Sequence, residues 1–203
     1  LGCIWNPIDS CGLYIPGGKA IYPSSVLMNA VAAKLAGVKR IVLVSPAKNK
    51  KIRSEILASA QLSGVNKVFM IGGAQAIAAL TYGTETIEKV DKIFGPGNAF
   101  VAEAKKQVFG DVGIDSIAGP SEVMVIADKN SNPEWIAVDL LSQAEHDEDA
   151  RAILVSDSLS LIQSVNYHIS QHLKTIDRKE IAKASIKKNG LANVGSLDNA
   201  IVV

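Results

Sequence analysis

Gln143 and His146 combine residue types and a spacing that suit metal binding. They lie three residues apart in LSQAEH (residues 141–146), and on a helix this spacing places both side chains on one face. An amide oxygen and an imidazole nitrogen aimed at one point supply part of a metal site, because a catalytic zinc usually has at least about three protein ligands. A surface histidine near a helix end, solvated among the acidic residues 147–149, explains the same spacing without a metal.

The other histidines and the serines offer weaker signals. His168 and His172 form an i, i+4 pair without a His-Glu-x-x-His pattern, and we read them as part of a solvated helix face. Ser121 either caps a turn or contacts a substrate. No Gly-x-Ser-x-Gly motif is present and no base stands next to Ser121, so serine hydrolase chemistry is disfavoured.

Three glycine-rich turns are expected where strands pass into helices, at residues 15–18, 72–75 and 95–98. Glycine lets a ligand approach the backbone, and the N–H groups of a following helix attract phosphate. A nucleotide cofactor is therefore a candidate ligand. None of the turns is a Gly-x-Gly-x-x-Gly fingerprint with an acidic residue about 20 positions further on, and glycine and proline are also ordinary turn residues.

Polar side chains beside these turns sharpen the nucleotide hypothesis without deciding it. Gln75 and Asn98 stand at expected helix starts, where Asn98 either caps a helix or directs its amide toward a cofactor. Tyr14 is either an interior tyrosine with a locally satisfied hydroxyl or a ring that stacks on a planar base.

Short β-branched runs alternate with amphipathic segments along the chain, which predicts parallel sheets with helices on their faces. Gly37 and Gly64 are expected to end two of the helices. A domain boundary is expected near Ser121. The predicted strands are residues 40–44, 67–71, 92–94, 122–127 and 152–155, and the predicted helices are residues 24–36, 51–63, 74–82, 98–109, 133–145 and 159–173.

Composition narrows the class of protein. The 203 residues carry a formal net charge of +1, with lysine and arginine spread along the chain, so nucleic acid and membrane surfaces are not expected partners. Cys3 and Cys11 have no Cys-x-x-Cys spacing, which favours a reducing compartment. No apolar run of about 18 residues and no signal peptide is present, and we expect a cytoplasmic protein. Since the chain begins without Met and ends in the apolar run 201–203, we expect a fragment of a longer chain.

Five motifs, taken together and in order, resemble the histidinol dehydrogenase family. The resemblance is firmest between residues 12 and 155. The motifs are GLYIPGG at 12–18, GGAQAIAAL at 72–80, KIFGPGNAFV at 92–101, AGPSEV at 118–123 and LSQAEH at 141–146.

The resemblance implies a zinc-dependent, NAD-linked oxidation of L-histidinol through the aldehyde to L-histidine, carried out by a homodimer in histidine biosynthesis. It implies that NAD contacts Tyr14, Gln75 and Asn98. It also implies that Gln143 and His146 are zinc ligands, and that both line the substrate pocket with Ser121. Zinc would then orient the substrate while NAD carries the redox chemistry.

The resemblance further implies an α/β fold of incomplete, Rossmann-like, doubly wound parallel sheets in two domains. Residues 1–13 are then a remnant of the first domain and residues 14–121 the NAD-contacting Rossmann-like domain. Residues 122–203 are a truncated second part of the first domain and carry the zinc and substrate ligands.

One departure from the family pattern limits these expectations. The family's acid/base pair lies in a Gly-Pro-Glu-His motif, which this sequence lacks, and its remaining zinc ligands, an Asp and a His, also lie further toward the C-terminus. We therefore expect the chain alone to be inactive, with no catalytic residue of its own. Two alternatives stay open: a non-catalytic nucleotide-binding module, and a related zinc and NAD dehydrogenase that oxidises another small alcohol.

Overall fold

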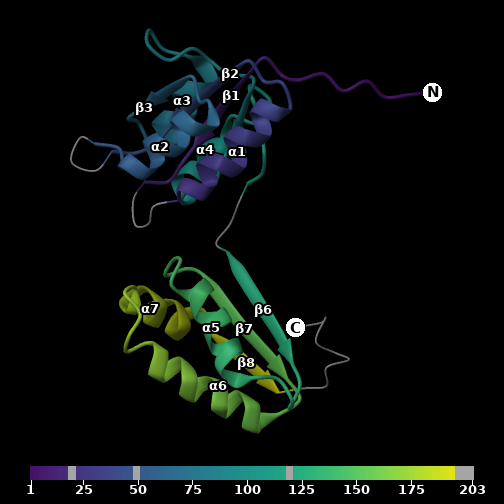
Figure 1. Ribbon diagram of the computed structural model, residues 1–203, viewed down its shortest axis with the longest axis vertical. Coiled ribbons are helices and arrows are strands. Elements are labelled where there is room, and N and C mark those ends of the chain that lie inside the picture. Colours follow the sequence, from purple (N-terminus) through teal and green to yellow (C-terminus); the bar gives the residue numbers. More distant parts are fainter. Residues whose placement is uncertain (18–21, 48–50, 118–120, 195–203) are drawn as a thin grey trace. The chain divides into compact units, whose positions relative to one another are not determined.

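A computed structural model describes residues 1–17, 22–47, 51–117 and 121–194. The chain divides into two compact units, residues 1–119 and 120–203. Each unit contains its own parallel sheet, with helices in the connections between strands (Figure 1). The α/β fold with parallel sheets is therefore confirmed. The apolar run at 201–203 lies outside the described residues.

The first unit contains a five-stranded parallel sheet in the order β3-β2-β1-β4-β5. From β1 the chain moves outward to β3 on one side, and then returns to add β4 and β5 on the other. The β1–β4 pair is thus the point where the strand order reverses, beside which open α/β sheets bind ligands at the carboxyl ends of their strands. The strands are β1 (Ser10–Tyr14), β2 (Arg40–Val44), β3 (Lys67–Phe69), β4 (Lys92–Phe94) and β5 (Gly113–Ile114).

Helices cover both faces of this sheet, as a doubly wound fold requires. Alternate residues of β2 pack in opposite directions: Ile41 and Leu43 join a core with α1 and α2, whereas Val42 and Val44 join a core with α3 and α4. The helices are α1 (Pro23–Leu35), α2 (Ser54–Ser63), α3 (Gly73–Tyr82) and α4 (Ala99–Gln107).

The central strand β1 was not predicted from the sequence. Gly12 lies in its middle, and an interior glycine weakens a strand signal. The structure shows what this glycine provides: a Cβ at position 12 would lie 2.8 Å from Cδ1 of Leu80, so its absence lets α3 pack closely on the sheet. Since β1 pairs with β2 and β4, the predicted domain boundary after residue 13 passes through a strand of the first unit's sheet.

Helix and strand ends differ modestly from those expected. The strand predicted at 67–71 ends at Phe69, and the helix predicted from residue 51 begins at Ser54. Gly37 and Gly64 do end α1 and α2, with left-handed φ angles of 88° and 80°. Left-handed backbone at a helix end favours glycine because it has no side chain to clash.

The second unit contains a three-stranded parallel sheet in the order β6-β7-β8. Alternate β6 residues face a core formed with α5 and α6, and α7 packs against the end of α5. The three helices lie on one face of this sheet (Figure 1), and on the other face Met124 and Ile126 are exposed. The elements are β6 (Glu122–Ala127), α5 (Pro133–Ala144), β7 (Arg151–Ser156), α6 (Leu159–His172), α7 (Lys179–Asn189) and β8 (Leu191–Val194).

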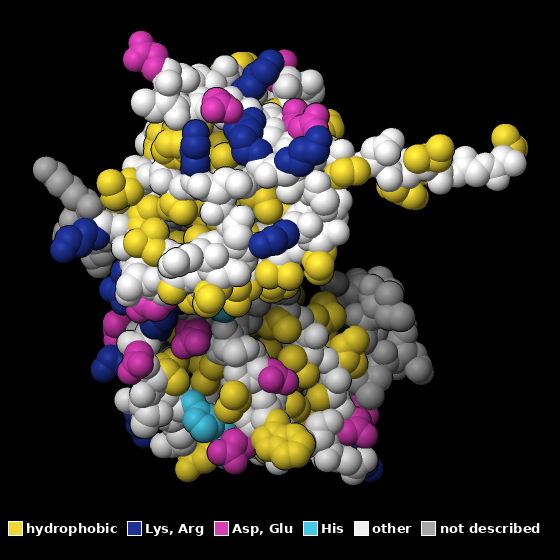
Figure 2. All heavy atoms as spheres, turned by 45° about the horizontal axis from the view of Figure 1, so that its top comes forward, with side chains coloured by type: hydrophobic (Ala, Val, Ile, Leu, Met, Phe, Trp, Pro, Cys, Tyr) yellow, Lys and Arg dark blue, Asp and Glu magenta, His cyan; other side chains and the backbone are white. Residues whose placement is uncertain are grey.

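The surface carries both signs of charge. On the face drawn in Figure 2, lysine and arginine side chains are interspersed with acidic ones, and hydrophobic side chains are exposed between them. The described part of the chain contains no helix that is both long and apolar enough to span a membrane.

Candidate functional site

The residues predicted to contact NAD meet at one edge of the first unit's sheet. Tyr14 is the last residue of β1, Gln75 lies in the first turn of α3, and Asn98 is the N-cap of α4. Because the strands are parallel, their carboxyl ends lie at a common edge. The structure thus brings the three side chains to the edge where the strand order reverses.

Tyr14 connects two of the turns at this edge. Its side chain is 3% exposed, and its hydroxyl oxygen accepts a hydrogen bond of 3.1 Å from the backbone N–H of Gly73, the first residue of α3. Gly73 has a left-handed φ of 71°, and a Cβ there would meet the Gln75 amide oxygen at 2.9 Å. The side chain of Gln75 therefore lies close over the glycine turn that Tyr14 holds.

A buried lysine holds the turn that follows β4. Lys105 is 3% exposed and forms an ion pair with Asp115, while its Nζ also donates to the Gly95 carbonyl oxygen at 3.1 Å. The Gly95 N–H donates to the Asp115 carboxylate at 2.7 Å. Gly95 has a φ of 112°, and a Cβ there would collide with the backbone oxygen of Tyr14. These hydrogen bonds and the ion pair hold the turn in close contact with the end of β1.

Asn98 acts as a helix cap. Its Oδ1 accepts a hydrogen bond of 3.1 Å from the N–H of Val101, which satisfies one of the unpaired donors at the start of α4. The residue is exposed, and its amide nitrogen is the polar atom that this cap does not use. Capping and a ligand contact through the nitrogen are therefore compatible.

Ser45 adds a polar group at the same edge. It follows β2 and is 1% exposed, and its hydroxyl has no hydrogen-bond partner among the described residues. A Cβ at Gly17 would lie 3.0 Å from this hydroxyl, so the turn after β1 passes close by. A buried hydroxyl without a hydrogen-bond partner destabilises the folded state. A ligand bound at this edge would supply a partner for the Ser45 hydroxyl.

The predicted zinc and substrate residues lie in the second unit. Gln143 is in the last turn of α5 and His146 follows the end of that helix. Ser121 directly precedes β6, and its carbonyl oxygen accepts from the N–H of Arg151 at the start of β7. Since α5 ends where the chain approaches β7, all three residues are brought to the amino end of this sheet.

His146 and Gln143 have the chemistry of metal ligands. The Nδ1 of His146 lies 3.1 Å from the carbonyl oxygen of Ser142. If Nδ1 donates there, the ring lone pair is on Nε2, the arrangement in which a ligating histidine is oriented by its other nitrogen. The Gln143 side chain has a buried Nε2 atom with no hydrogen-bond partner among the described residues, and amide oxygen and nitrogen positions are interchangeable assignments. An oxygen and a nitrogen donor fit zinc as a partial ligand set.

Helix α7 and its N-cap residue Arg178 contact the segment that carries His146. Arg178 donates to the carbonyl oxygen of His146 at 3.1 Å, and the Ser185 hydroxyl donates to that of Ala150 at 2.9 Å. Lys188 forms an ion pair with Asp149, and this hydrogen-bonded carboxylate raises the pKa of Lys188. The loop between α5 and β7 is therefore fixed at several points.

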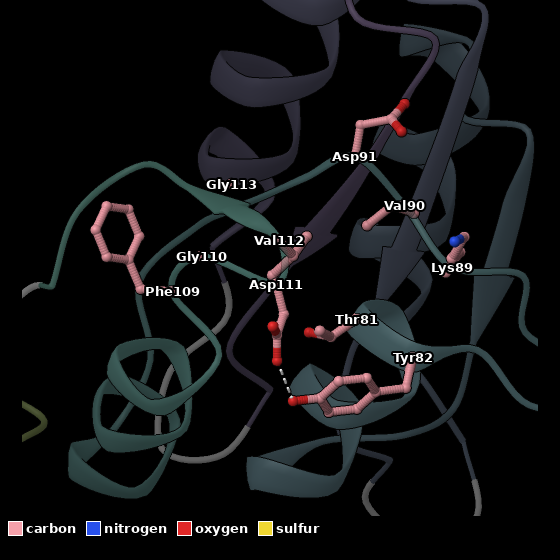
Figure 3. Close-up of a pocket in the computed structure, with 10 residues that line it drawn as sticks. All are labelled: Thr81, Tyr82, Lys89, Val90, Asp91, Phe109, Gly110, Asp111, Val112 and Gly113. Carbon is pink, nitrogen blue, oxygen red and sulfur yellow. Dashed lines mark hydrogen bonds between the residues drawn. The ribbon is translucent and has the colours of Figure 1, made fainter.

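A shallow depression of about 600 Å³ lies at the opposite edge of the first sheet. Figure 3 shows Tyr82 and Asp111 directed toward one another in it, with the tyrosine hydroxyl donating to the carboxylate at 2.7 Å. This hydrogen bond raises the pKa of Tyr82. Asp91 and Gly113, which also line it, precede or begin strands, so the depression is at the amino ends of β4 and β5. None of the residues predicted to contact NAD, zinc or substrate lines this depression.

Sequence reasoning missed Ser45, Lys105 and Asp115. Ser45 is a small residue at a strand end, a pattern shared by many strands. Nothing in the spacing of Lys105 and Asp115 distinguishes them from surface charges, because their pairing depends on how α4 lies against the residue that follows β5. The sequence carried no signal for that contact.

Comparison with known proteins identifies the family. A family model described as histidinol dehydrogenase matches residues 1–203. Histidinol dehydrogenase from Rhizobium meliloti (strain 1021) is 60% identical over 190 residues, which cover 94% of this chain and 44% of that protein. The enzyme from Methylococcus capsulatus (strain ATCC 33009 / NCIMB 11132 / Bath) is 53% identical and covers 100% of this chain and 47% of its own length.

A solved structure agrees with this assignment. The crystal structure of histidinol dehydrogenase from Elizabethkingia anophelis superposes with a TM-score of 0.91 at 44% sequence identity, covering 97% of this chain and 46% of that one. The chain thus spans less than half the length of these relatives. Because the family model matches it from end to end, this chain belongs to the histidinol dehydrogenase family.

Proposed function

We propose that this chain is the central part of a zinc-dependent, NAD-linked histidinol dehydrogenase, which oxidises L-histidinol through the aldehyde to L-histidine. The observation that carries the proposal is the match of all 203 residues to the family model. The oxidation of the alcohol would pass one hydride to NAD⁺ and release one proton. The oxidation of the aldehyde would consume one water, pass a hydride to a second NAD⁺ and release two protons as the carboxylate forms, so the reaction consumes two NAD⁺ for each histidine formed.

NAD would bind at the carboxyl edge of the first unit's sheet. Tyr14, Gln75 and Asn98 lie at this edge. The unpartnered hydroxyl of Ser45 supports a ligand there. The N–H groups of Gly73 and Gly95 already bond to Tyr14 and Asp115. A pyrophosphate would therefore be bound by N–H groups of the exposed residues that follow at the starts of α3 and α4, 74–75 and 99–100.

Zinc would be held by Gln143 and His146, together with donors from outside these 203 residues. Bound zinc would supply an electrophilic anchor for the amino and imidazole nitrogens of the substrate. Gln143 and His146 fix the position of that anchor. The Ser121 hydroxyl, at the same end of the sheet, would orient the bound alcohol.

Catalysis requires more than this chain. Two donors are fewer than a catalytic zinc usually has, and the family's acid/base motif does not occur among the 203 residues. The isolated chain should therefore not oxidise histidinol. In the complete gene product we propose a homodimer located in the cytoplasm.

The proposal is tested by the substrate preference of the complete gene product. NADH formation is measured with L-histidinol, other amino alcohols and sulfonated diols. We expect the highest kcat/KM with L-histidinol and two NADH for each histidine. A higher kcat/KM for another alcohol would assign the protein to a different reaction.

A second candidate is a non-catalytic nucleotide-binding module. It is favoured by one observation: Tyr14, Gln75 and Asn98 all lie at the glycine-rich edge of the first unit. Calorimetric titration of the isolated chain with NAD⁺ tests the cofactor contacts on which both candidates depend. Binding without turnover fits either candidate. The absence of binding would show that Tyr14, Gln75 and Asn98 are not sufficient to bind NAD⁺.

A further inference from the structure

Helices α5 and α6 bring together three potential metal ligands that lie apart from the candidate zinc site. Glu134 is in the first turn of α5, and His168 and His172 are in the last turns of α6. The ligand atoms of the three side chains all lie within 4.8 Å of one another. The two histidines are half-buried, whereas their spacing alone predicted a solvated helix face. That reading is corrected because α6 turns these positions toward α5.

The two imidazole rings are arranged as a chelating pair. Their centroids are 6.5 Å apart and their planes are inclined by 27°, as expected for side chains one helical turn apart. The ring of Tyr167 packs edge-on against that of His168, with a centroid distance of 5.5 Å. The helix therefore holds both rings on one side before any ligand binds.

His172 has an unmet bonding capacity at the centre of this cluster. Its Nε2 is buried and has no hydrogen-bond partner among the described residues. The nearest carboxylate oxygen, Oε1 of Glu134, is 3.6 Å away, beyond hydrogen-bonding distance. A buried polar atom in this position is stabilised by a cation that both groups can ligate.

We propose that Glu134, His168 and His172 form a second metal site, selective for zinc or a neighbouring transition metal. Two imidazole nitrogens and one carboxylate oxygen suit Zn²⁺, Cu²⁺ or Ni²⁺, and disfavour Mg²⁺ and Ca²⁺, which prefer oxygen ligands. Three protein ligands leave a position for water or for an external donor.

This site is separate from Gln143 and His146. Glu134 and Gln143 are nine residues apart on α5, which is about 14 Å along the axis. A metal at the new site would join the first turn of α5 to the last turn of α6. Because the metal would bind the folded unit, the free energy of unfolding of that unit should increase as the metal concentration rises.

The test is a zinc titration of the chelator-stripped complete gene product, in which the other predicted site is weakened by His146→Ala. We expect this variant to bind one equivalent of Zn²⁺ that is lost in His146→Ala/His168→Ala/His172→Ala. The variant Glu134→Gln should bind that equivalent at least about tenfold more weakly, because even the loss of groups that only orient metal ligands costs 10–100-fold.

Controls separate metal binding from folding. Gln171→Ala, beside His172 but outside the cluster, should keep the equivalent, and far-UV circular dichroism should show the same helix content for every variant. Zn²⁺ should raise the melting temperature of the His146→Ala protein and not that of the triple variant. Equal zinc stoichiometry and equal melting shifts in these two proteins would refute the proposed site. No zinc binding in either protein would refute it as well.

Discussion

The hydroxyl oxygen of Tyr14 accepts a hydrogen bond of 3.1 Å from the backbone N–H of Gly73. This bond joins the end of the central strand β1 to the first residue of α3, two elements separated by 59 positions in the sequence. It fixes the Gly73 turn, one of the turns at which we place NAD, against the end of β1.

Replacing this tyrosine should affect stability and cofactor binding together. Tyr14→Phe removes the acceptor for the Gly73 N–H, so we expect a loss of about 1 kcal/mol in the free energy of unfolding and a higher KM for NAD⁺ in the complete gene product. Urea unfolding and initial rates measure the two effects. Tyr82→Phe is the matched control, because Tyr82 bonds to Asp111 at the opposite edge of the sheet and should leave the KM unchanged. An equal rise in KM for both variants would exclude a specific role for Tyr14.

Gly95 and Gly110 allow a test of close packing at the β1–β4 edge. Their φ angles are 112° and 110°, which L side chains rarely adopt, so alanine strains the backbone at both positions by about 1–3 kcal/mol. Only at position 95 would the new Cβ collide with Tyr14, while at position 110 nothing lies within 4 Å. Gly95→Ala should therefore reduce the free energy of unfolding well beyond Gly110→Ala in urea denaturation. Equal losses would show that the turn relaxes away from β1.

The buried Lys105 should be sensitive to neutral replacement. Lys105→Met leaves the Gly95 carbonyl and the Asp115 carboxylate without their shared donor. Breaking a buried pair in this way costs about 3–5 kcal/mol, and the lower end applies because the Asp115 side chain is 27% exposed. The exposed neighbour Lys106 provides the control, and Lys106→Met should change the free energy of unfolding by less than about 0.5 kcal/mol. Denaturant titration compares the two variants, and similar values would contradict the role of the pair.

Cys11 predicts a loss of stability in alkaline solution. Burial raises the pKa of its thiol from 9.0 to about 11, against a smaller opposing effect of Arg40. Between these values the unfolded chain loses a proton that the folded chain keeps, so the free energy of unfolding should fall as the pH rises from about 9 to about 11. The Cys11→Ala protein should lack this contribution.

Thiol labelling gives a second test of the same burial. Cys3 is exposed and Cys11 is buried, so a thiol reagent at pH 8 should modify the first in the folded protein and both only after denaturation. Mass spectrometry identifies the modified residue. Rapid labelling of Cys11 in the folded chain would show that β1 is accessible to solvent.

Local patterns predicted much of this fold because they reflect burial. The β-branched run of β2 and the glycines that end α1 and α2 have simple physical signatures, and the structure confirms them. Strand β1 was missed because Gly12 is explained only by the approach of Leu80 from α3. Helix α7 was missed as well: its sequence, KEIAKASIKKN, is largely polar and buries only Ala182 and Ser185.

In the candidate site, too, features with a local sequence pattern were predicted, and features that depend on packing between elements were not. Glycine-rich turns and the spacing of Gln143 and His146 are local features, so both were found in the sequence. The pairing of Lys105 with Asp115 and the cluster of Glu134 with two histidines depend on packing between elements. No spacing within one segment predicts such contacts.

The most direct test of the account is the effect of His146→Ala on the zinc content and histidinol oxidation of the complete gene product. Ser142→Ala is the control, because it retains the backbone carbonyl oxygen that lies 3.1 Å from Nδ1 of His146. We predict that His146→Ala loses about one equivalent of zinc and most of kcat while its KM for NAD⁺ is little changed, and that Ser142→Ala retains both zinc and activity. A His146→Ala enzyme with full zinc content and undiminished histidinol oxidation would contradict the central claim.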